Sequence, residues 1–233
     1  VDGSGSVTSF VVKAVSSGSL KIGTTEASAQ AWNASTNATV DATYKAYWTP
    51  VPNANGTLNA FTAVAKDNNG AESSTAIMAT VTVAAVNDAP TGTSSTLTIL
   101  EDGSKTFTAN DFGFSDAVEN HALQAVIITT LPTAGTLTLS GVAVSANQSI
   151  ALTNLGNLVY TPTANANGNS YATIGFKVQD AGGTTNGGVD TSISANTLTV
   201  NVSAVNDAPV LSTVAASGAI TESLGLGTAS GST

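Results

Sequence analysis

The sequence predicts an all-β protein made of β-sandwich domains in series. The hexapeptide AVNDAP stands at 85–90 and again at 204–209, each time after a run in which apolar and polar residues alternate. The composition is rich in Thr, Ser, Gly, Val and Asn, which are residues of strands and turns. Because no segment keeps an apolar period of about 3.6 residues over the length of a helix, parallel βαβ units are not expected.

Each hexapeptide reads as a joint between two domains. Its Asn-Asp pair ends a strand, and the Pro that follows two residues later cannot donate a hydrogen bond to a sheet. Asn87 and Asn206 are 119 positions apart, a common size for a domain with its own core. We therefore expect a β-sandwich repeat that lacks its first strands at 1–86, a complete repeat at 87–205, and a joint with the opening strand or strands of a further repeat at 206–233.

Candidate strands occur in matched pairs, one in each repeat. The pairs are 7–15 with 123–130, 19–22 with 135–139, 61–67 with 174–180, and 79–83 with 198–202. Between them, YWTP and NANG at 47–50 and 53–56 match VYTP and NANG at 159–162 and 165–168, at a constant shift of 112 positions. About seven short strands with turn signals between them are typical of a sandwich rather than of a barrel or a propeller blade.

The first repeat lacks the segment that opens the second. Residues 97–116 have no counterpart before Val7, whereas the residues after Pro209 resemble the opening of a further copy, with Glu222 in the place of Glu101. Three interpretations stay open: one period of a longer array, a subunit whose tail supplies the first strands of its neighbour, or an arbitrary boundary. A repeat without those strands exposes sheet edges that invite strand addition.

Charge and composition exclude several classes of function. The net charge of −9 argues against a nucleic-acid surface, which needs basic clusters, and suits divalent cations or solubility. Without Cys, the chain has neither disulfides nor thiolate sites. No apolar run approaches the roughly 18 residues that span a bilayer, so no membrane-spanning segment is expected. The composition also favours an extracellular setting.

These residues together resemble the cadherin-like tandem repeats, often called VCBS repeats, of very large bacterial surface and RTX-type adhesins. The motifs that carry the resemblance are EDG at 101–103, DFGFSD at 111–116, ITTLP at 128–132 with GTL at 135–137, YTP at 160–162, NANG at 165–168 and VNDAP at 205–209. The resemblance implies tandem Ig-like or cadherin-like β-sandwiches, type I secretion, a place on the bacterial cell surface, adhesion or biofilm work, and calcium at the joints.

Carboxylate and amide oxygens at the ends of the sandwiches are the candidate metal ligands. Calcium takes six to eight oxygens, and no single loop supplies that number, whereas a joint fed by two repeats and the linker would. At the first joint the candidates are Asn87, Asp88, Asp116, Glu119 and Asp180. At the second joint they are Glu101, Asp102, Asn206 and Asp207. The other end of the first repeat offers Asp67, Asp2 and the Glu222 of a preceding unit. All of these are equally suited to be ordinary turn residues.

The function indicated is that of a spacer in an extracellular adhesin or surface fibre, with neighbouring repeats or identical subunits as partners. Two alternatives remain: a filament subunit whose tail completes the next head, and a carbohydrate-binding module that uses Trp32 to stack a sugar of a surface polysaccharide. Trp48 replaces Tyr160 and is expected to pack inside. His121 is the single imidazole and has no nucleophile motif to support it, so no enzyme is expected.

Overall fold

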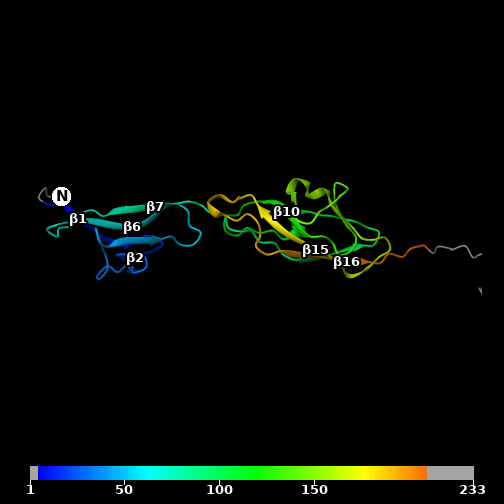
Figure 1. The fold of residues 1–233 in the computed structure, drawn as a ribbon, viewed down its shortest axis with the longest axis horizontal. Helices are drawn as coiled ribbons and strands as arrows, with labels where there is room; N and C mark the ends of the chain where they lie inside the picture. The colour runs from blue at the N-terminus through cyan, green and yellow to red at the C-terminus, as the bar shows by residue number, and fades with distance from the viewer. Residues whose placement is uncertain (1–4, 209–233) are drawn as a thin grey trace, which may run out of the picture.

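The computed structural model describes residues 5–208, and nearly all of its regular structure is β-strand (Figure 1). The all-β fold class predicted from the sequence is confirmed. We call residues 5–84 the head repeat and residues 87–203 the middle repeat. Asp2 and Glu222, two of the candidate ligands, lie outside the described residues. Within the described part, no helix is long and apolar enough to cross a membrane.

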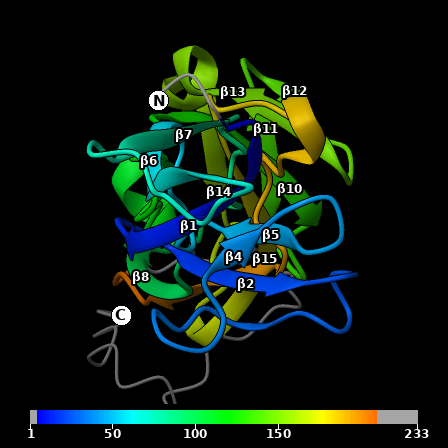
Figure 2. The same cartoon turned by 90° about the vertical axis from the view of Figure 1, so that its left-hand side faces the viewer.

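The head repeat holds seven strands in two sheets. They are β1 (Val7–Val15), β2 (Ser19–Gly23), β3 (Gln30–Ala31), β4 (Thr39–Val40), β5 (Lys45–Thr49), β6 (Gly56–Asp67) and β7 (Ile77–Val83). The sheet orders are β4-β1-β6-β7 and β3-β2-β5, with all neighbours antiparallel. Figure 2 views these strands from the head end of the molecule.

The middle repeat holds nine strands and three short 3-10 helices. They are β8 (Ser95–Leu100), β9 (Lys105–Thr106), η1 (Ala109–Phe112), β10 (Leu123–Thr130), β11 (Thr136–Leu139), β12 (Val142–Ala143), β13 (Gln148–Ala151), η2 (Leu152–Asn157), β14 (Leu158–Thr161), β15 (Gly168–Asp180), η3 (Thr185–Gly187) and β16 (Asn196–Ser203). Their sheet orders are β13-β10-β15-β16-β8 and β12-β11-β14-β9, in which only β16 and β8 run parallel.

The two repeats share one plan, strand for strand. β1, β6 and β7 occupy the places of β10, β15 and β16, and β2 and β5 occupy those of β11 and β14. The middle repeat adds one strand at the same side of each sheet, β8 beside β16 and β9 beside β14. Among residues 5–208, nothing pairs with the corresponding edges of β7 and β5.

Alternation of apolar and polar residues explains the buried faces of the strands. Along β15, Ile174, Phe176 and Val178 are buried while the residues between them are half-buried. They pack with residues of both sheets into the core of the middle repeat, which includes Phe107 and Phe112. The head repeat has a much smaller core of its own, formed by Val12, Leu20 and Ile22 with partly buried neighbours. Neither core cluster contains residues from both repeats.

One glycine contact recurs in both repeats. Gly135 has a positive φ of 74°, and a Cβ there would lie 2.6 Å from the Tyr160 hydroxyl, which donates to the Ala134 carbonyl at 2.9 Å. In the head repeat, Gly18 has a φ of 67° beside Trp48, whose indole N–H donates to the Ser17 carbonyl at 2.7 Å. The aromatic residue of each sheet therefore anchors the same turn.

Two features differ from the sequence-based expectation. β6 and β15 begin at Gly56 and Gly168, earlier than expected, because the Gly of each NANG motif starts the strand. The short strands β3, β4, β9, β12 and β13 were not expected individually. Two to four residues are too few to show an alternating pattern.

Candidate cation site at the first joint

Asn87 ties the first joint to the middle repeat. Its side-chain Nδ2 donates to both carboxylate oxygens of Asp180, at 3.0 and 3.2 Å, and to the Val189 carbonyl at 2.8 Å. The backbone carbonyl of Asn87 accepts from Val189 N–H at 2.9 Å. Asn87 is only 7% exposed, and Asp180, at the end of β15, is fully buried. Asn87 of the joint is therefore bonded to the middle repeat and packed into its end.

The remaining side-chain atom of Asn87 has no partner. Because Nδ2 is identified by three acceptors, Oδ1 points the other way, and it is buried without a hydrogen bond among the described residues. Nδ1 of His121 is also buried and unpaired there. A Cβ at Gly182 would collide with Asn87 Oδ1 and would lie 2.6 Å from His121 Nδ1, so both atoms face the same small space.

Asp116 organises the loop opposite the joint. Its carboxylate accepts from the N–H groups of Val118 at 3.2 Å, Glu119 at 3.2 Å and His121 at 2.7 Å. Burial by itself raises the pKa of this carboxyl, but the backbone donors, that of His121 foremost, outweigh burial and hold the pKa below its usual value. Asp116 is therefore an anion at neutral pH, and its hydrogen bonds to these backbone N–H groups fix the conformation of the loop at 116–121.

Three titratable side chains of this loop converge on one place. The ligating atoms of Asp116, Glu119 and His121 all lie within 4.8 Å of one another. His121 Nδ1 is 3.3 Å from Asp116 Oδ2. Glu119 Oε2 in turn accepts from the backbone N–H of Asp88 at 3.3 Å, which links the loop to the joint.

A cleft of about 460 Å³ lies between the two repeats beside this cluster. The head repeat lines it with Asn53 and Asn55, and the joint lines it with residues 85–87. The middle repeat contributes Val118, Glu119, His121, Gly182, Thr185 and Asn186. Asn186 Nδ2 also donates to the Ala85 carbonyl at 3.1 Å. Oxygen-bearing side chains of both repeats thus face one space.

The donor set fits a hard divalent cation. Carboxylates of Asp116 and Glu119 and the unpartnered amide oxygen of Asn87 are ligands of the kind that Ca²⁺ takes. Asp88 is exposed, and its backbone N–H donates to Glu119. The Asp180 carboxylate already accepts from Asn87 Nδ2 twice and from Gly182 N–H at 2.8 Å. It therefore acts as a support behind Asn87 rather than facing the cleft. The imidazole of His121 adds a nitrogen, which suits borderline metals better than calcium.

The second joint is held by one carboxylate. Glu101 is buried, and its Oε1 accepts from Val205 N–H at 2.6 Å while Oε2 accepts from Asn167 Nδ2 at 2.9 Å. Those two donors, Val205 N–H foremost, hold the pKa of Glu101 below its usual value. Asp102, Asn206 and Asp207 are exposed, and no hydrogen bond in the described part joins them to Glu101.

The last described candidate, Asp67, lies in a turn of the head repeat away from the first joint. Its Oδ1 accepts from Asn69 N–H at 2.9 Å and from Ala71 N–H at 2.8 Å, so it shapes the turn after β6. Asp67 is therefore not brought together with the first-joint residues.

Sequence reasoning missed two features of the site. It did not consider Asn53 and Asn55, although their motif recurs in the middle repeat, where the equivalent Asn167 contacts the Glu101 carboxylate. That recurrence was the available signal. It also did not consider His121 as part of the joint, where its ring nitrogen Nδ1 is buried beside Asp116. Only the folded loop shows this, because a lone His carries no spacing pattern.

The two tryptophans pack against the head core. Trp32 and Trp48 are partly buried against the cluster of Val12, Leu20 and Ile22. Trp48 was expected to pack inside, and Trp32 was the candidate for stacking a sugar. The indole N–H of Trp32 is buried without a partner among the described residues. Its contact with the core leaves less ring face for a ligand.

Comparison with known proteins agrees with an Ig-like repeat. A family described as "Bacterial Ig domain" matches residues 87–192, which is most of the middle repeat. No curated protein matched the chain. Among solved structures, the crystal structure of human mucin-like protocadherin EC1-2 aligns with 17% sequence identity over 80% of this chain and 85% of that chain, at a TM-score of 0.38.

Proposed function

We propose that the chain is a structural segment of an extracellular bacterial adhesin or surface fibre, in which a calcium ion stiffens the joint between two sandwich repeats. The match of residues 87–192 to a bacterial Ig domain supports a structural or adhesion-type repeat. Repeats joined in series contact only their neighbours, so the length of such a segment scales with the number of repeats.

The observation that carries the calcium site is the unpartnered Oδ1 of Asn87. A buried polar atom without a partner costs free energy, roughly 1–3 kcal/mol, so such atoms usually have a ligand or water. This one is held in place by Asp180 and lies by the cluster of Asp116, Glu119 and His121.

The cation would act on the joint in two ways. It would neutralise carboxylates of Asp88, Asp116 and Glu119 that otherwise repel one another. Within the cleft it would also stand between the middle repeat and the amides Asn53 and Asn55 of the head repeat. Both effects oppose bending at residues 85–90.

Calorimetric titration with Ca²⁺, paired with small-angle scattering, tests the proposal. We expect saturable binding and a longer, straighter particle in calcium than in chelator. Glu119→Gln should weaken binding by about tenfold or more, since it removes one charged ligand. The control is Glu26→Gln, which removes the same charge at an exposed turn of the head repeat. Superimposable scattering curves with and without calcium would overturn the stiffening, and equal affinities of the two variants would overturn the site.

The setting of the segment is part of the same proposal. A place outside the cell or on its surface, type I secretion and a role in biofilms follow from the resemblance of the motifs to adhesin repeats. No catalytic role is proposed. The carbohydrate-binding alternative is not favoured by the packing of Trp32 against the core.

A second candidate function is favoured by one observation. In the described residues, the outer edges of β7 and β5 have no neighbour, although the same edges of the middle repeat are paired with β8 and β9. An open pair of edges on one side of a sandwich suits a filament subunit that accepts strands from another copy.

A further inference from the structure

We infer that the head repeat accepts the segment 214–226 of a second copy of this chain, which pairs in parallel with β7 and caps the first joint with its Glu222. This inference rests on the second candidate function above. We choose a segment of this chain as the partner because, in the middle repeat, β8 and β9 of the chain itself cover the surface that is open in the head repeat.

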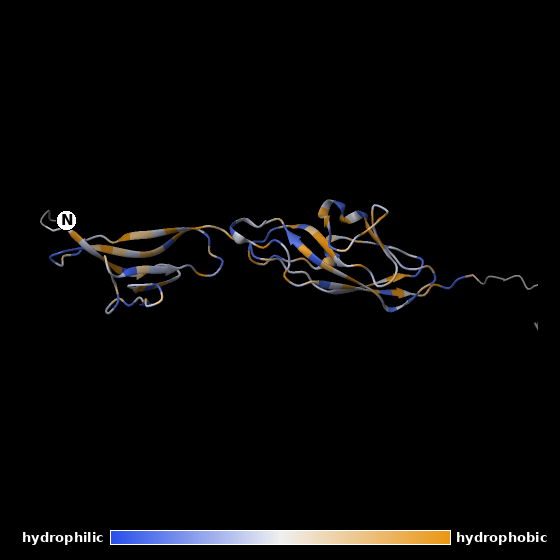
Figure 3. Ribbon diagram, in the orientation of Figure 1, coloured by the Kyte–Doolittle hydropathy of each residue, from blue (hydrophilic) through white to orange (hydrophobic). Residues whose placement is uncertain are grey.

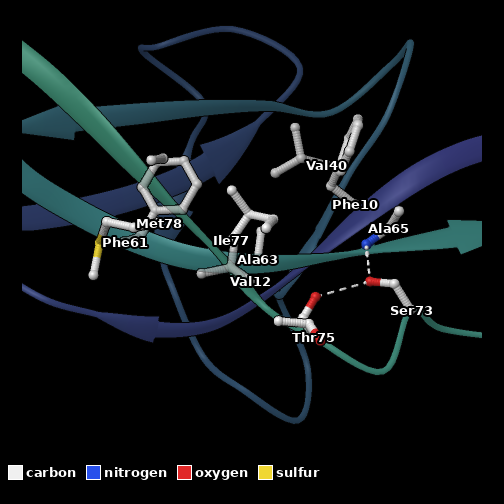
Figure 4. Close-up of a pocket in the computed structure, with 11 residues that line it drawn as sticks. Phe10, Val12, Val40, Phe61, Ala63, Ala65, Ser73, Thr75, Ile77 and Met78 are labelled. Carbon is white, nitrogen blue, oxygen red and sulfur yellow. Dashed lines mark hydrogen bonds between the residues drawn. The ribbon is translucent and has the colours of Figure 1, made fainter.

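The surface at issue is an apolar groove in the head repeat. Its volume is about 500 Å³, and all but two of its lining residues are apolar (Figure 4). The lining residues include Phe10 of β1, Ala63 and Ala65 of β6, and Ile77, Met78 and Ala79 of β7. Orange, hydrophobic segments run along the same strands in Figure 3.

Equivalent positions in the two repeats differ sharply in exposure. Phe10 on β1 pairs with Ala65, as Val126 on β10 pairs with Val178, yet Phe10 is 51% exposed and Val126 is 0% exposed. On the strand before the joint, Val81 stands 119 positions before Val200, and the two are 37% and 0% exposed. Side chains that the middle repeat buries are thus uncovered in the head repeat.

The middle repeat shows what covers them. β8 pairs along β16 from Leu198 opposite Ser95 to Ser203 opposite Leu100, and Leu97 and Ile99 of β8 pack on the core. The chain then crosses to β9 and places Phe112 against Phe176, with ring centroids 5.0 Å apart. The head repeat has the smaller Ala63 in the place of Phe176, and Ala63 lines the groove.

The tail sequence matches the covering strand. With Glu222 in the place of Glu101, residues 216–221 stand opposite 79–84 in the register that β8 keeps with β16, and Ile220 takes the place of Ile99. Alternate residues toward the core would be Val214, Ala216, Gly218 and Ile220, all apolar or small. Leu224 and Leu226 follow and supply two further apolar side chains.

The joint supplies a receptor for Glu222. In the middle repeat the Glu101 carboxylate accepts from Val205 N–H and from Asn167 Nδ2. The corresponding donors at the first joint are Val86 N–H and the amide of Asn55, and neither has a hydrogen bond in the described residues. Both residues line the cleft beside the candidate cation site. Strand exchange would therefore bring one more carboxylate to that cleft.

Engineered cysteines test the register, because the chain has no cysteine of its own. Thr82→Cys in one chain and Ala219→Cys in a mass-tagged second chain correspond to the pair Asn201 and Thr98 of the middle repeat. Mixed under mild oxidation, they should form the mixed disulfide dimer in large excess over Thr80→Cys mixed with Ala219→Cys. In that control the two positions are displaced by two residues, about 7 Å. Equal yields from the two mixtures, or no mixed dimer, would overturn the inference.

Association of the whole chain provides the second readout. We expect concentration-dependent oligomers by sedimentation that disappear when residues 210–233 are deleted. Ile220→Lys should weaken association by about tenfold or more, since it places a charge in an apolar face. Ile193→Lys is the matched control, because Ile193 is 81% exposed in a loop of the middle repeat. A monomer at every concentration would overturn the inference. A disulfide formed only within a single chain carrying both cysteines would do so too, since the tail would then fold onto its own head.

The outcome is separable from that of the calcium proposal. Both readouts are taken in calcium and in chelator, alongside the calorimetric titration. Strand exchange without calcium binding would refute the cation site alone, and calcium binding by a strict monomer would refute strand exchange alone.

Discussion

The amide of Asn87 bridges both carboxylate oxygens of Asp180 across 93 positions of the sequence, at 3.0 and 3.2 Å. This contact fixes the joint to the end of β15 and orients Oδ1 of the same amide toward the cluster of Asp116, Glu119 and His121. A single side chain thus sets both the attachment of the joint and the geometry of the candidate cation site.

Replacing Asn87 should separate these two roles. Asn87→Ala leaves the buried Asp180 carboxylate without its amide donor, and we expect a loss of roughly 1–3 kcal/mol in the free energy of unfolding in chelator. Asn87→Asp sets a second carboxylate against Asp180 and should be at least as destabilising. Calcium should restore much of the stability of Asn87→Asp and little of that of Asn87→Ala, as measured by chemical denaturation. Identical calcium responses would contradict a ligand role for the side chain at position 87.

Metal selectivity should depend on His121. Its Nδ1 lies 3.3 Å from Asp116 Oδ2, at a site whose other donors are oxygens. Because imidazole favours zinc over calcium, His121→Gln should lower zinc affinity by about tenfold or more and change calcium affinity little. Competition calorimetry with the two ions measures this. A larger loss for calcium than for zinc would show that the ring supports the calcium ligands.

Acid should release the second joint. Val205 N–H and the Asn167 amide hold the pKa of Glu101 below its usual value. Because the folded pKa is the lower one, the carboxylate contributes stability above the unfolded value of about 4.3, and this contribution is lost as the pH falls through the folded pKa. The amide resonance of Val205 should therefore shift with Glu101 protonation in an NMR titration below about pH 4.3. In Glu101→Gln that transition should vanish. A Val205 resonance that titrates identically in both proteins would contradict the contact.

Two glycines on neighbouring turns give a matched test of close packing. Gly135→Ala combines a φ of 74° with a Cβ placed 2.6 Å from the Tyr160 hydroxyl. We therefore expect the free energy of unfolding to fall by well above about 1 kcal/mol. Gly141→Ala has a similar φ of 80° but meets nothing within 4 Å, and it should cost about 1 kcal/mol from backbone strain alone. Thermal denaturation of both variants checks the difference. Equal losses would mean that backbone strain alone explains both.

The division of the chain into separate domains at 1–86 and 87–205 is a proposal that calorimetry can test. The head core is small and the middle core is large, so two unfolding transitions should appear, with the head repeat melting first. Phe112→Ala removes a fully buried ring and should lower the free energy of unfolding of the middle repeat by roughly 3–5 kcal/mol, which shifts the upper transition to lower temperature. Phe61→Ala, in the head repeat, should lower only the other transition. A single transition that moves with both substitutions would show one cooperative unit.

Much of the fold was accessible from local patterns. Alternating residues marked the long strands β1 and β10 at their observed bounds, and the shared motifs YWTP and VYTP aligned β5 with β14. The resemblance of the motifs to adhesin repeats pointed to the joints as the place of interest. Strands of two residues, such as β3 and β9, carried no signal, because their existence depends on a partner strand.

The all-β class and the internal repeat could be predicted from the residues alone, because strand period, turn residues and internal matches are local properties of the chain. Which polar groups contact one another, in contrast, depends on the folded structure. Asp180 accepts from Asn87, and Glu101 accepts from Asn167 across 66 positions of the sequence. Asn87 Oδ1 lies near His121 without a hydrogen bond in the described residues. Those meetings depend on how loops from distant strands converge at the ends of a sandwich, and no local pattern specifies that convergence.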